Sequence, residues 1–107
     1  AEVKRLFKLV LSQKEYNISD KIAKAKCNIN MGDISGVLLK IFIFKRGDKR
    51  SLVSREIRVE NADFGIDVDI EKLGEGEYEI VGVLEKDGKI LGEQEAEFSK
   101  MKGAFDE

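Results

Sequence analysis

Three aspartates at alternate positions are the residues of this sequence that come closest to a reactive or metal-binding group. Asp63, Asp67 and Asp69 share one parity, so on a β-strand their carboxylates lie on one face, with neighbouring positions about 6.6–7 Å apart. Carboxylate pairs catalyse glycoside hydrolysis and carboxylate clusters bind calcium, but calcium needs roughly six to eight oxygens that converge from a loop. Nothing in the segment predicts a cleft, a buried carboxyl or such a loop. We therefore expect a solvated strand face that opposes Lys24 and Lys26.

Other groups that serve as nucleophiles, general bases or soft metal ligands are scarce. The chain has no His and a single Cys, Cys27. A lone thiol forms neither a disulfide within the chain nor a cysteine-based zinc site, and a nucleophilic Cys would need a His partner. We expect Cys27 to be a small buried hydrophobe. The sequence thus predicts no catalytic residue, no cofactor and no metal ligand, and it favours a protein that is not an enzyme.

The tripeptide Arg46-Gly47-Asp48 matches the motif that integrins recognise in adhesive proteins. Three common residues produce this motif often by chance, and Gly and Asp are also the residues that a hairpin loop requires. We therefore interpret the tripeptide as part of a loop between two strands and not as an adhesion site.

Length and composition predict one folded domain without a membrane segment. The chain has 107 residues, of which 42% are apolar, close to the norm for globular domains. Its longest apolar run, Val37–Phe44, contains Lys40 and is far shorter than the roughly 20 residues that span a bilayer. The first residues place basic side chains within an apolar run, whereas a signal peptide places them ahead of it. We expect no membrane insertion and identify no targeting signal. The sequence does not identify the compartment. We favour an extracellular or cell-envelope location, with the chain as part of a longer precursor.

Charged residues are abundant and unevenly distributed. They make up 37% of the chain, and 14 Lys and 13 Glu contrast with 2 Gln and 4 Asn, a composition that resembles heat-adapted proteins. Residues 1–50 carry 12 Lys and Arg against 5 Asp and Glu, whereas residues 51–107 carry 7 against 16. The basic residues alternate along expected strands with few aromatic residues between them. We therefore expect them to pair with acidic strands rather than to bind nucleic acid.

Alternation of apolar and polar residues dominates the chain, and no window shows a convincing helical period. Turn signals such as Asp87-Gly88 separate the alternating runs. We expect seven strands, near residues 3–12, 21–30, 36–45, 51–59, 63–70, 76–86 and 89–98. The last run is less regular than the others, as at a bulge or an edge. The pattern predicts a single β-sandwich domain over residues 1–98, with residues 99–107 as a tail or a link to a further domain.

Residues 73–91 carry a recognisable motif. Leu73, Gly76 and Tyr78 form the pattern Leu-x-x-Gly-x-Tyr, which an alternating run and the Asp87-Gly88 turn follow. Together with seven short strands, the motif resembles an immunoglobulin-like or fibronectin-III-like accessory module of the kind found in bacterial and archaeal multidomain proteins such as glycoside hydrolases. The resemblance implies an all-β, seven-stranded immunoglobulin-like antiparallel β-sandwich. It also implies that Tyr78 forms a tyrosine corner, its hydroxyl bonded to upstream backbone. Unlike antibody domains, the chain has no second Cys and no Trp.

The third expected strand is apolar at both parities. If Lys40 faces solvent, the odd-numbered residues from Val37 to Ile43 face the core. Leu38, Phe42 and Phe44 then lie on the outer face of the sheet. The alternative places the two phenylalanines in the core, with Lys40 at a strand end or snorkelling to solvent.

The resemblance places the sixth strand beside the third, with Val81 and Val83 on the same outer face. An exposed apolar patch usually marks an interface. The sequence thus predicts a possible interface that consists of Leu38, Phe42, Phe44, Val81 and Val83.

These observations favour a non-catalytic immunoglobulin-like module that acts as a structural spacer or docking domain of a larger protein. Its partner would be a neighbouring domain or another protein. The alternative is a free-standing β-sandwich that binds a ligand or partner, for example carbohydrate or protein, through a sheet face. No nucleic acid is expected as a partner, and a small-molecule ligand is left open.

Overall fold

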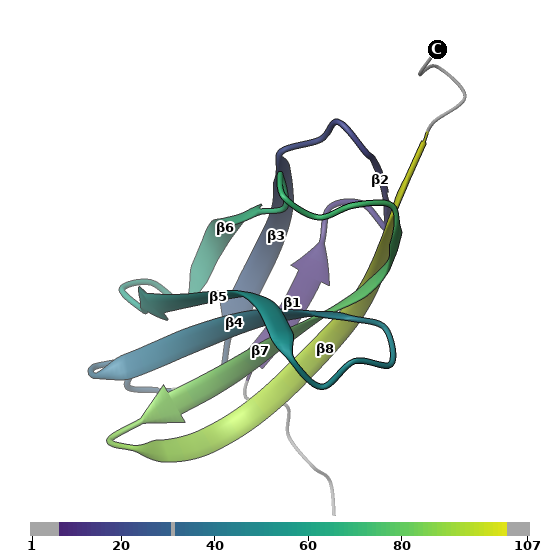
Figure 1. The fold of residues 1–107 in the computed structure, drawn as a ribbon. Coiled ribbons are helices and arrows are strands. Elements are labelled where there is room, and N and C mark those ends of the chain that lie inside the picture. The colour runs from purple at the N-terminus through teal and green to yellow at the C-terminus, as the bar shows by residue number, and fades with distance from the viewer. Residues whose placement is uncertain (1–6, 31, 103–107) are drawn as a thin grey trace, which may run out of the picture.

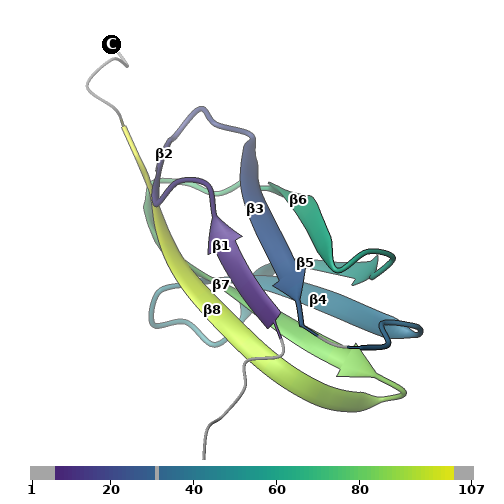
Figure 2. The same cartoon turned by 180° about the vertical axis from the view of Figure 1, so that it is seen from behind.

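The structure, a computed structural model, describes residues 7–30 and 32–102. These residues form an all-β fold of eight strands in two sheets. The small sheet has the order β1-β3-β6 and consists of β1 (Phe7–Leu11), β3 (Ile22–Ile29) and β6 (Asp63–Asp69). The large sheet has the order β2-β8-β7-β4-β5 and consists of β2 (Glu15–Asn17), β8 (Lys89–Met101), β7 (Gly76–Lys86), β4 (Val37–Lys45) and β5 (Ser51–Arg58). The large sheet is curled like half a barrel, with β7 and β8 as its long curved strands (Figures 1 and 2).

The all-β, two-sheet architecture agrees with the prediction, and each of the seven expected strands overlaps an observed one. The strand number and the wholly antiparallel arrangement are wrong. An additional strand, β2, pairs in parallel with the end of β8, where Glu15 stands opposite Ser99, so the large sheet is mixed. Because β8 continues to Met101, part of the expected tail belongs to the sheet. Residues 3–6 of the first expected strand and residues 103–107 of the expected tail lie outside the described residues.

Strands β3 and β6 pair with each other, and strict alternation explains why each buries one face. Every second residue of β3, from Ala23 to Ile29, is buried, and the residues between them are exposed. On β6, Ile66 and Val68 are buried and the residues next to them are exposed, since successive side chains of a strand point to opposite faces. The small sheet therefore has one dry face and one wet face.

The core lies between the inner faces of the two sheets. Its members are apolar side chains that are at most 6% exposed, and they come from both sheets and from the segments beside them. The main contributors are Phe7, Leu9, Ala23, Ala25, Cys27, Val37, Leu39, Ile41, Ile43, Ile66, Val68, Ile80, Leu84 and Phe98. Burial of these side chains is the main source of stability, at about 25 cal/mol for each Å² of apolar surface removed from water.

The β7–β8 connection is the predicted two-residue hairpin. Asp87 and Gly88 have φ values of 53° and 78°, and Lys86 stands opposite Lys89 at the end of the ladder. Positive φ at both central residues is the requirement of a type I′ turn, whose twist matches that of the flanking strands. The hairpin fixes the register of the two longest strands, which carry one side of the candidate interface.

Candidate interface on the large sheet

Strands β4 and β7 are direct neighbours, as the resemblance implies, and they pair antiparallel along their length. Phe42 stands opposite Val81, and Lys40 stands opposite Val83. The odd-numbered residues of β4 from Val37 to Ile43 are 0% exposed. Because side chains alternate along a strand, Phe42 and Phe44 lie on the outer face, and the alternative that places them in the core does not hold.

The candidate residues form a stripe on that outer face that is apolar except for one ion pair. Leu38, Phe42, Phe44, Val81 and Val83 are all half-buried. The rings of Phe42 and Phe44 lie 6.4 Å apart between centroids, at 39° to each other, so they shield part of each other's surface. Lys40 lies among them, but its ammonium group reaches Glu85 on β7 at 3.1 Å. Because Glu85 stands opposite Leu38, this ion pair lies within the stripe and separates Leu38 from the other four residues.

Carboxylates border the stripe along β8. Glu93, Glu95 and Glu97 are exposed and stand opposite Val83, Val81 and Glu79 of β7. Among the described residues, no ion pair within 4 Å involves any of these glutamates. The outer face of the large sheet is therefore apolar in the middle of β4 and β7, and it is negative along β8 and toward both ends of β7, where Glu79 and Glu85 lie.

One arginine lies at the end of this acidic border. Arg46 donates a hydrogen bond from its guanidinium group to Glu77 Oε2 at 2.8 Å. This bond, together with the charges of Glu77, Glu97 and Glu79, raises the pKa of Arg46. Arg46 belongs to the tripeptide Arg46-Gly47-Asp48 in the β4–β5 loop, where Asp48 Oδ1 accepts a hydrogen bond from the backbone of Arg50. Both charged side chains of the tripeptide thus have a partner within the chain.

Tyr78 makes the contact that the resemblance implies for a tyrosine corner. Its hydroxyl donates a hydrogen bond to the Gly74 carbonyl oxygen at 2.7 Å, and burial raises the pKa of Tyr78. Leu73 is buried nearby, and Gly76 has a φ of 153°, which favours glycine. The contact positions the start of β7, and with it the register of the stripe.

The aspartates do not belong to the stripe, since they lie on the outer face of the small sheet. Asp63, Asp67 and Asp69 are exposed; Asp67 stands opposite Lys24, as expected, whereas Lys26 stands opposite Gly65. Asp63 accepts a hydrogen bond from the side-chain amide of Asn28. Within residues 7–30 and 32–102, no group of three or more His, Cys, Asp or Glu side chains is placed to hold a metal ion.

Cys27 is 2% exposed and lies on the inner face of the small sheet. Burial, with a smaller contribution from the charge of Asp63, raises the pKa of its thiol to about 11. A thiol of this kind stays protonated near neutral pH and is a poor nucleophile.

Two buried polar side chains were not identified from the sequence. Lys100 is 1% exposed, and its ammonium group donates to the carbonyl oxygens of Ile70 at 2.7 Å and Asp20 at 3.1 Å. Burial lowers the pKa of Lys100. Tyr16 is also buried, and its hydroxyl has no hydrogen-bond partner in the described part of the chain. The only sequence signal for Lys100 is its parity, because Phe98 and Lys100 continue the inner face of β8.

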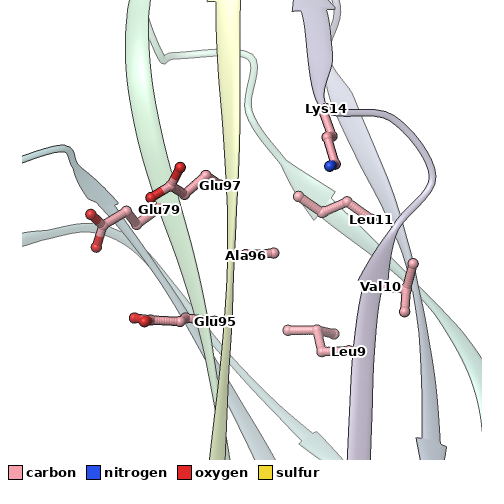
Figure 3. Close-up of a pocket in the computed structure, with 8 residues that line it drawn as sticks. All are labelled: Leu9, Val10, Leu11, Lys14, Glu79, Glu95, Ala96 and Glu97. Carbon is pink, nitrogen blue, oxygen red and sulfur yellow. The ribbon is translucent and has the colours of Figure 1, made fainter.

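A groove runs between β8 and β1, at one side of the molecule. Figure 3 shows Leu9 and Leu11 of β1 pointing toward Ala96 of β8, while Glu95 and Glu97 point away on the other side of β8. The full lining consists of Leu9, Val10, Leu11, Lys14, Glu79, Glu95, Ala96 and Glu97. The groove therefore has an apolar floor, with Lys14 at one end and the glutamates on the far side of β8.

Comparison with known proteins adds no family to this description. No protein-family model and no curated protein sequence matches the chain. Among the residues that the structure describes, no helix is long and apolar enough to cross a membrane. Inference about function therefore rests on the geometry of the two sheets.

Proposed function

We propose that this chain is a non-catalytic, immunoglobulin-like module that serves a larger protein as a spacer or docking domain, and that the docked protein surface packs on the outer face of β4 and β7. The observation that carries this proposal is the apolar stripe of Leu38, Phe42, Phe44, Val81 and Val83, which is half-buried in the isolated chain. A stripe of this kind with charged borders has the anatomy of a protein interface, in which aromatic anchors are surrounded by a polar rim.

The strand order supports the immunoglobulin-like part of the proposal. In constant-type immunoglobulin domains the first, second and fifth strands share one sheet, and the third, sixth and seventh share the other. Strands β1, β3 and β6 correspond to the first group, and β4, β7 and β8 to the second. Two features depart from that order: β5 pairs with β4 instead of β6, and β2 is additional.

The docking part of the proposal follows from the cost of leaving apolar surface in water. Phe42 and Val81 face each other across the ladder, and both retain surface that a partner would remove from solvent. Burying the exposed part of such side chains stabilises a complex by about 25 cal/mol per Å². The outer face of the small sheet exposes two large apolar residues, Val10 and Ile22. Each of them stands opposite a charged residue, Lys26 or Asp69, so this face has no facing apolar pair like that of Phe42 and Val81.

Site-specific photo-crosslinking tests the proposal. The photoreactive residue benzoyl-phenylalanine replaces Phe42 in the full-length protein of the source cells, and Lys24 on the small sheet is replaced as a matched control. We expect a discrete cross-linked product from position 42 alone, identified by mass spectrometry as another protein or another part of the same polypeptide. We further expect Val81→Asp to abolish the product while thermal melting confirms that the variant is folded. An equal yield of cross-linked product from both positions, or a product that persists with Val81→Asp, would refute docking at the stripe.

A further inference from the structure

The edge of β8 that faces β1 is a second exposed surface, separate from the stripe on β4 and β7. Strand β2 pairs only with Ser99–Met101, the last three residues of β8. Among the described residues, no strand pairs with Glu93–Phe98 on that side. Strand β1 lies beside β8 but belongs to the small sheet and pairs with β3 (Figure 2). The groove with the apolar floor lies between these two strands.

The hydrogen bonds at the end of β8 show which backbone groups this edge exposes. The backbone N–H of Ser99 donates to the Lys14 carbonyl oxygen at 2.9 Å, so the main-chain groups of Ser99 point away from β7. Backbone groups of successive strand residues point to opposite sides. Glu93, Glu95 and Glu97 share the parity of Ser99, and their N–H and C=O groups therefore point to the open edge. Their exposed side chains lie on the outer face of the large sheet.

We propose that this edge binds an extended peptide segment of another protein, which adds a strand to the large sheet beside β8 and carries basic residues at alternate positions. In such a pair, side chains directly opposite each other lie about 4.5–5.5 Å apart on one face, and opposite charges stabilise the pairing. Lys or Arg residues of the added strand would lie opposite Glu93, Glu95 and Glu97. The side chains between them would point toward Leu9 and Ala96, so small apolar residues fit there.

The charge of the edge selects against a second copy of this chain. Two β8 edges paired with each other would place glutamates opposite glutamates, and like charges at facing positions destabilise a sheet. Charged residues on an open edge are a known protection against self-association. They also make the edge selective, because they attract a strand with basic residues and repel a strand with acidic residues.

Binding of designed peptides to the full chain tests this proposal. The first peptide alternates Lys and Val, the second has the same composition with Lys and Val in two blocks, and the third is the alternating peptide with alternate amides methylated. Fluorescence anisotropy measures affinity, and NMR measures the shifts and exchange rates of the backbone amides. We expect the alternating peptide to bind most tightly and to slow exchange at Glu93, Glu95 and Glu97. Methylated amides cannot complete the ladder, so we expect the third peptide to lose binding.

Matched charge variants separate the edge from general attraction. The triple variant Glu93→Gln, Glu95→Gln, Glu97→Gln removes three cross-strand charge pairs, and we expect it to weaken binding about tenfold. The control is Asp63→Asn, Asp67→Asn, Asp69→Asn on the small sheet, which changes the net charge equally and should leave the affinity unchanged. Equal effects of the two variants, or equal binding of the alternating and block peptides, would overturn the proposal and leave the glutamates as protection of the edge only. The stripe variant Val81→Asp leaves the backbone edge intact, so this test and the docking test can fail separately.

Discussion

The two sheets share one core but differ on their outer faces. On the small sheet, Lys24 faces Asp67 across the β3–β6 ladder, and Asn28 bonds to Asp63. The exposed apolar residues of this face, Val10 and Ile22, each stand opposite a charged residue. On the large sheet, the corresponding face of β4 and β7 carries the apolar stripe, which one ion pair interrupts. Water and local pairs satisfy the first face, whereas the second gains free energy when something covers it. The comparison teaches that apolar side chains gather side by side on the outer face of the large sheet, whereas the exposed apolar residues of the small sheet stand singly among charged ones.

The largest expected effect compares the two faces of one strand. Leu84 on the inner face of β7 is 0% exposed, and its neighbour Val83 is half-buried on the outer face. Leu84→Ala leaves a cavity in the core, and we expect it to lower the free energy of unfolding by about 2–5 kcal/mol. Val83→Ala removes methyl groups that are partly solvated, and we expect a loss below about 1 kcal/mol. Urea unfolding measures both values.

The small sheet provides the control for this prediction. Val68 is 0% exposed on the inner face of β6, and its neighbour Asp67 is exposed on the outer face. We expect Val68→Ala to destabilise the chain and Asp67→Ala to have little effect, since exposed ion pairs contribute little. If Val83→Ala costs as much as Leu84→Ala, the apolar stripe stabilises the fold itself and the contrast between the two outer faces loses its functional meaning.

The second prediction tests whether the inner face of the small sheet is as dry as that of the large sheet. The Cys27 thiol has a pKa raised from 9.0 to about 11 by burial. Well below pH 9 the thiol is protonated in both the folded and the unfolded state. Between pH 9 and 11 the unfolded state loses the proton first, so the free energy of unfolding falls, by an amount on the order of 2–3 kcal/mol. Chemical unfolding at several alkaline pH values measures this loss.

The Cys27→Ala variant isolates the thiol from the other groups that titrate in this range. Tyr78 and Lys100 also have shifted pKa values, but they are common to both proteins and cancel in the difference. We expect the variant to lose less stability than the wild type between pH 9 and 11. Parallel pH profiles would indicate that water reaches Cys27 and that the two sheets do not share an equally dry core.

The two sheets also differ in how far the sequence predicts them. The strands of the small sheet follow from alternation, because one wet face and one dry face leave a period of two in β3 and β6. On β4 both faces are apolar, and Lys40 is the residue that distinguishes the outer parity from the inner one. The irregular pattern at the start of β8 reflects a register shift between Leu84 and Glu85 of β7, in agreement with the predicted bulge or edge.

Features that depend on pairing between distant segments could not be predicted. Strand β2 has three residues, too few to show a period, and it is a strand because Glu15 meets Ser99. Lys100 is buried because two carbonyl groups from distant turns converge on its ammonium group. The open edge of β8 likewise depends on where β2 stops, which no local pattern encodes. The candidate stripe was predictable because it needs only parity and one neighbouring strand.

The last prediction concerns the segment between β6 and β7, which carries the chain from the small sheet to the large one. The hydroxyl of Tyr78 bonds to Gly74 within this segment, and its ring stacks on Phe98 at 5.5 Å between centroids. The ring of Tyr16 packs against the same Phe98 at 5.7 Å, edge to face, but its hydroxyl has no partner in residues 7–30 and 32–102. The two tyrosines thus pack on the same phenylalanine, in different orientations, and only the hydroxyl of Tyr78 has a hydrogen-bond partner in the described residues.

Replacing each tyrosine by phenylalanine separates the hydrogen bond from the packing. Tyr78→Phe leaves the Gly74 carbonyl without this donor, and we expect a loss of about 1–2 kcal/mol in the free energy of unfolding. Tyr16→Phe removes a buried hydroxyl without a partner, and we expect no loss or a small gain. Urea unfolding of both variants under the same conditions measures the two changes in the free energy of unfolding. If both substitutions are neutral, packing on Phe98 alone holds the segment between β6 and β7 in place. If only Tyr78→Phe lowers the free energy of unfolding, the hydrogen bond fixes where β7 begins. It then also keeps Val81 opposite Phe42.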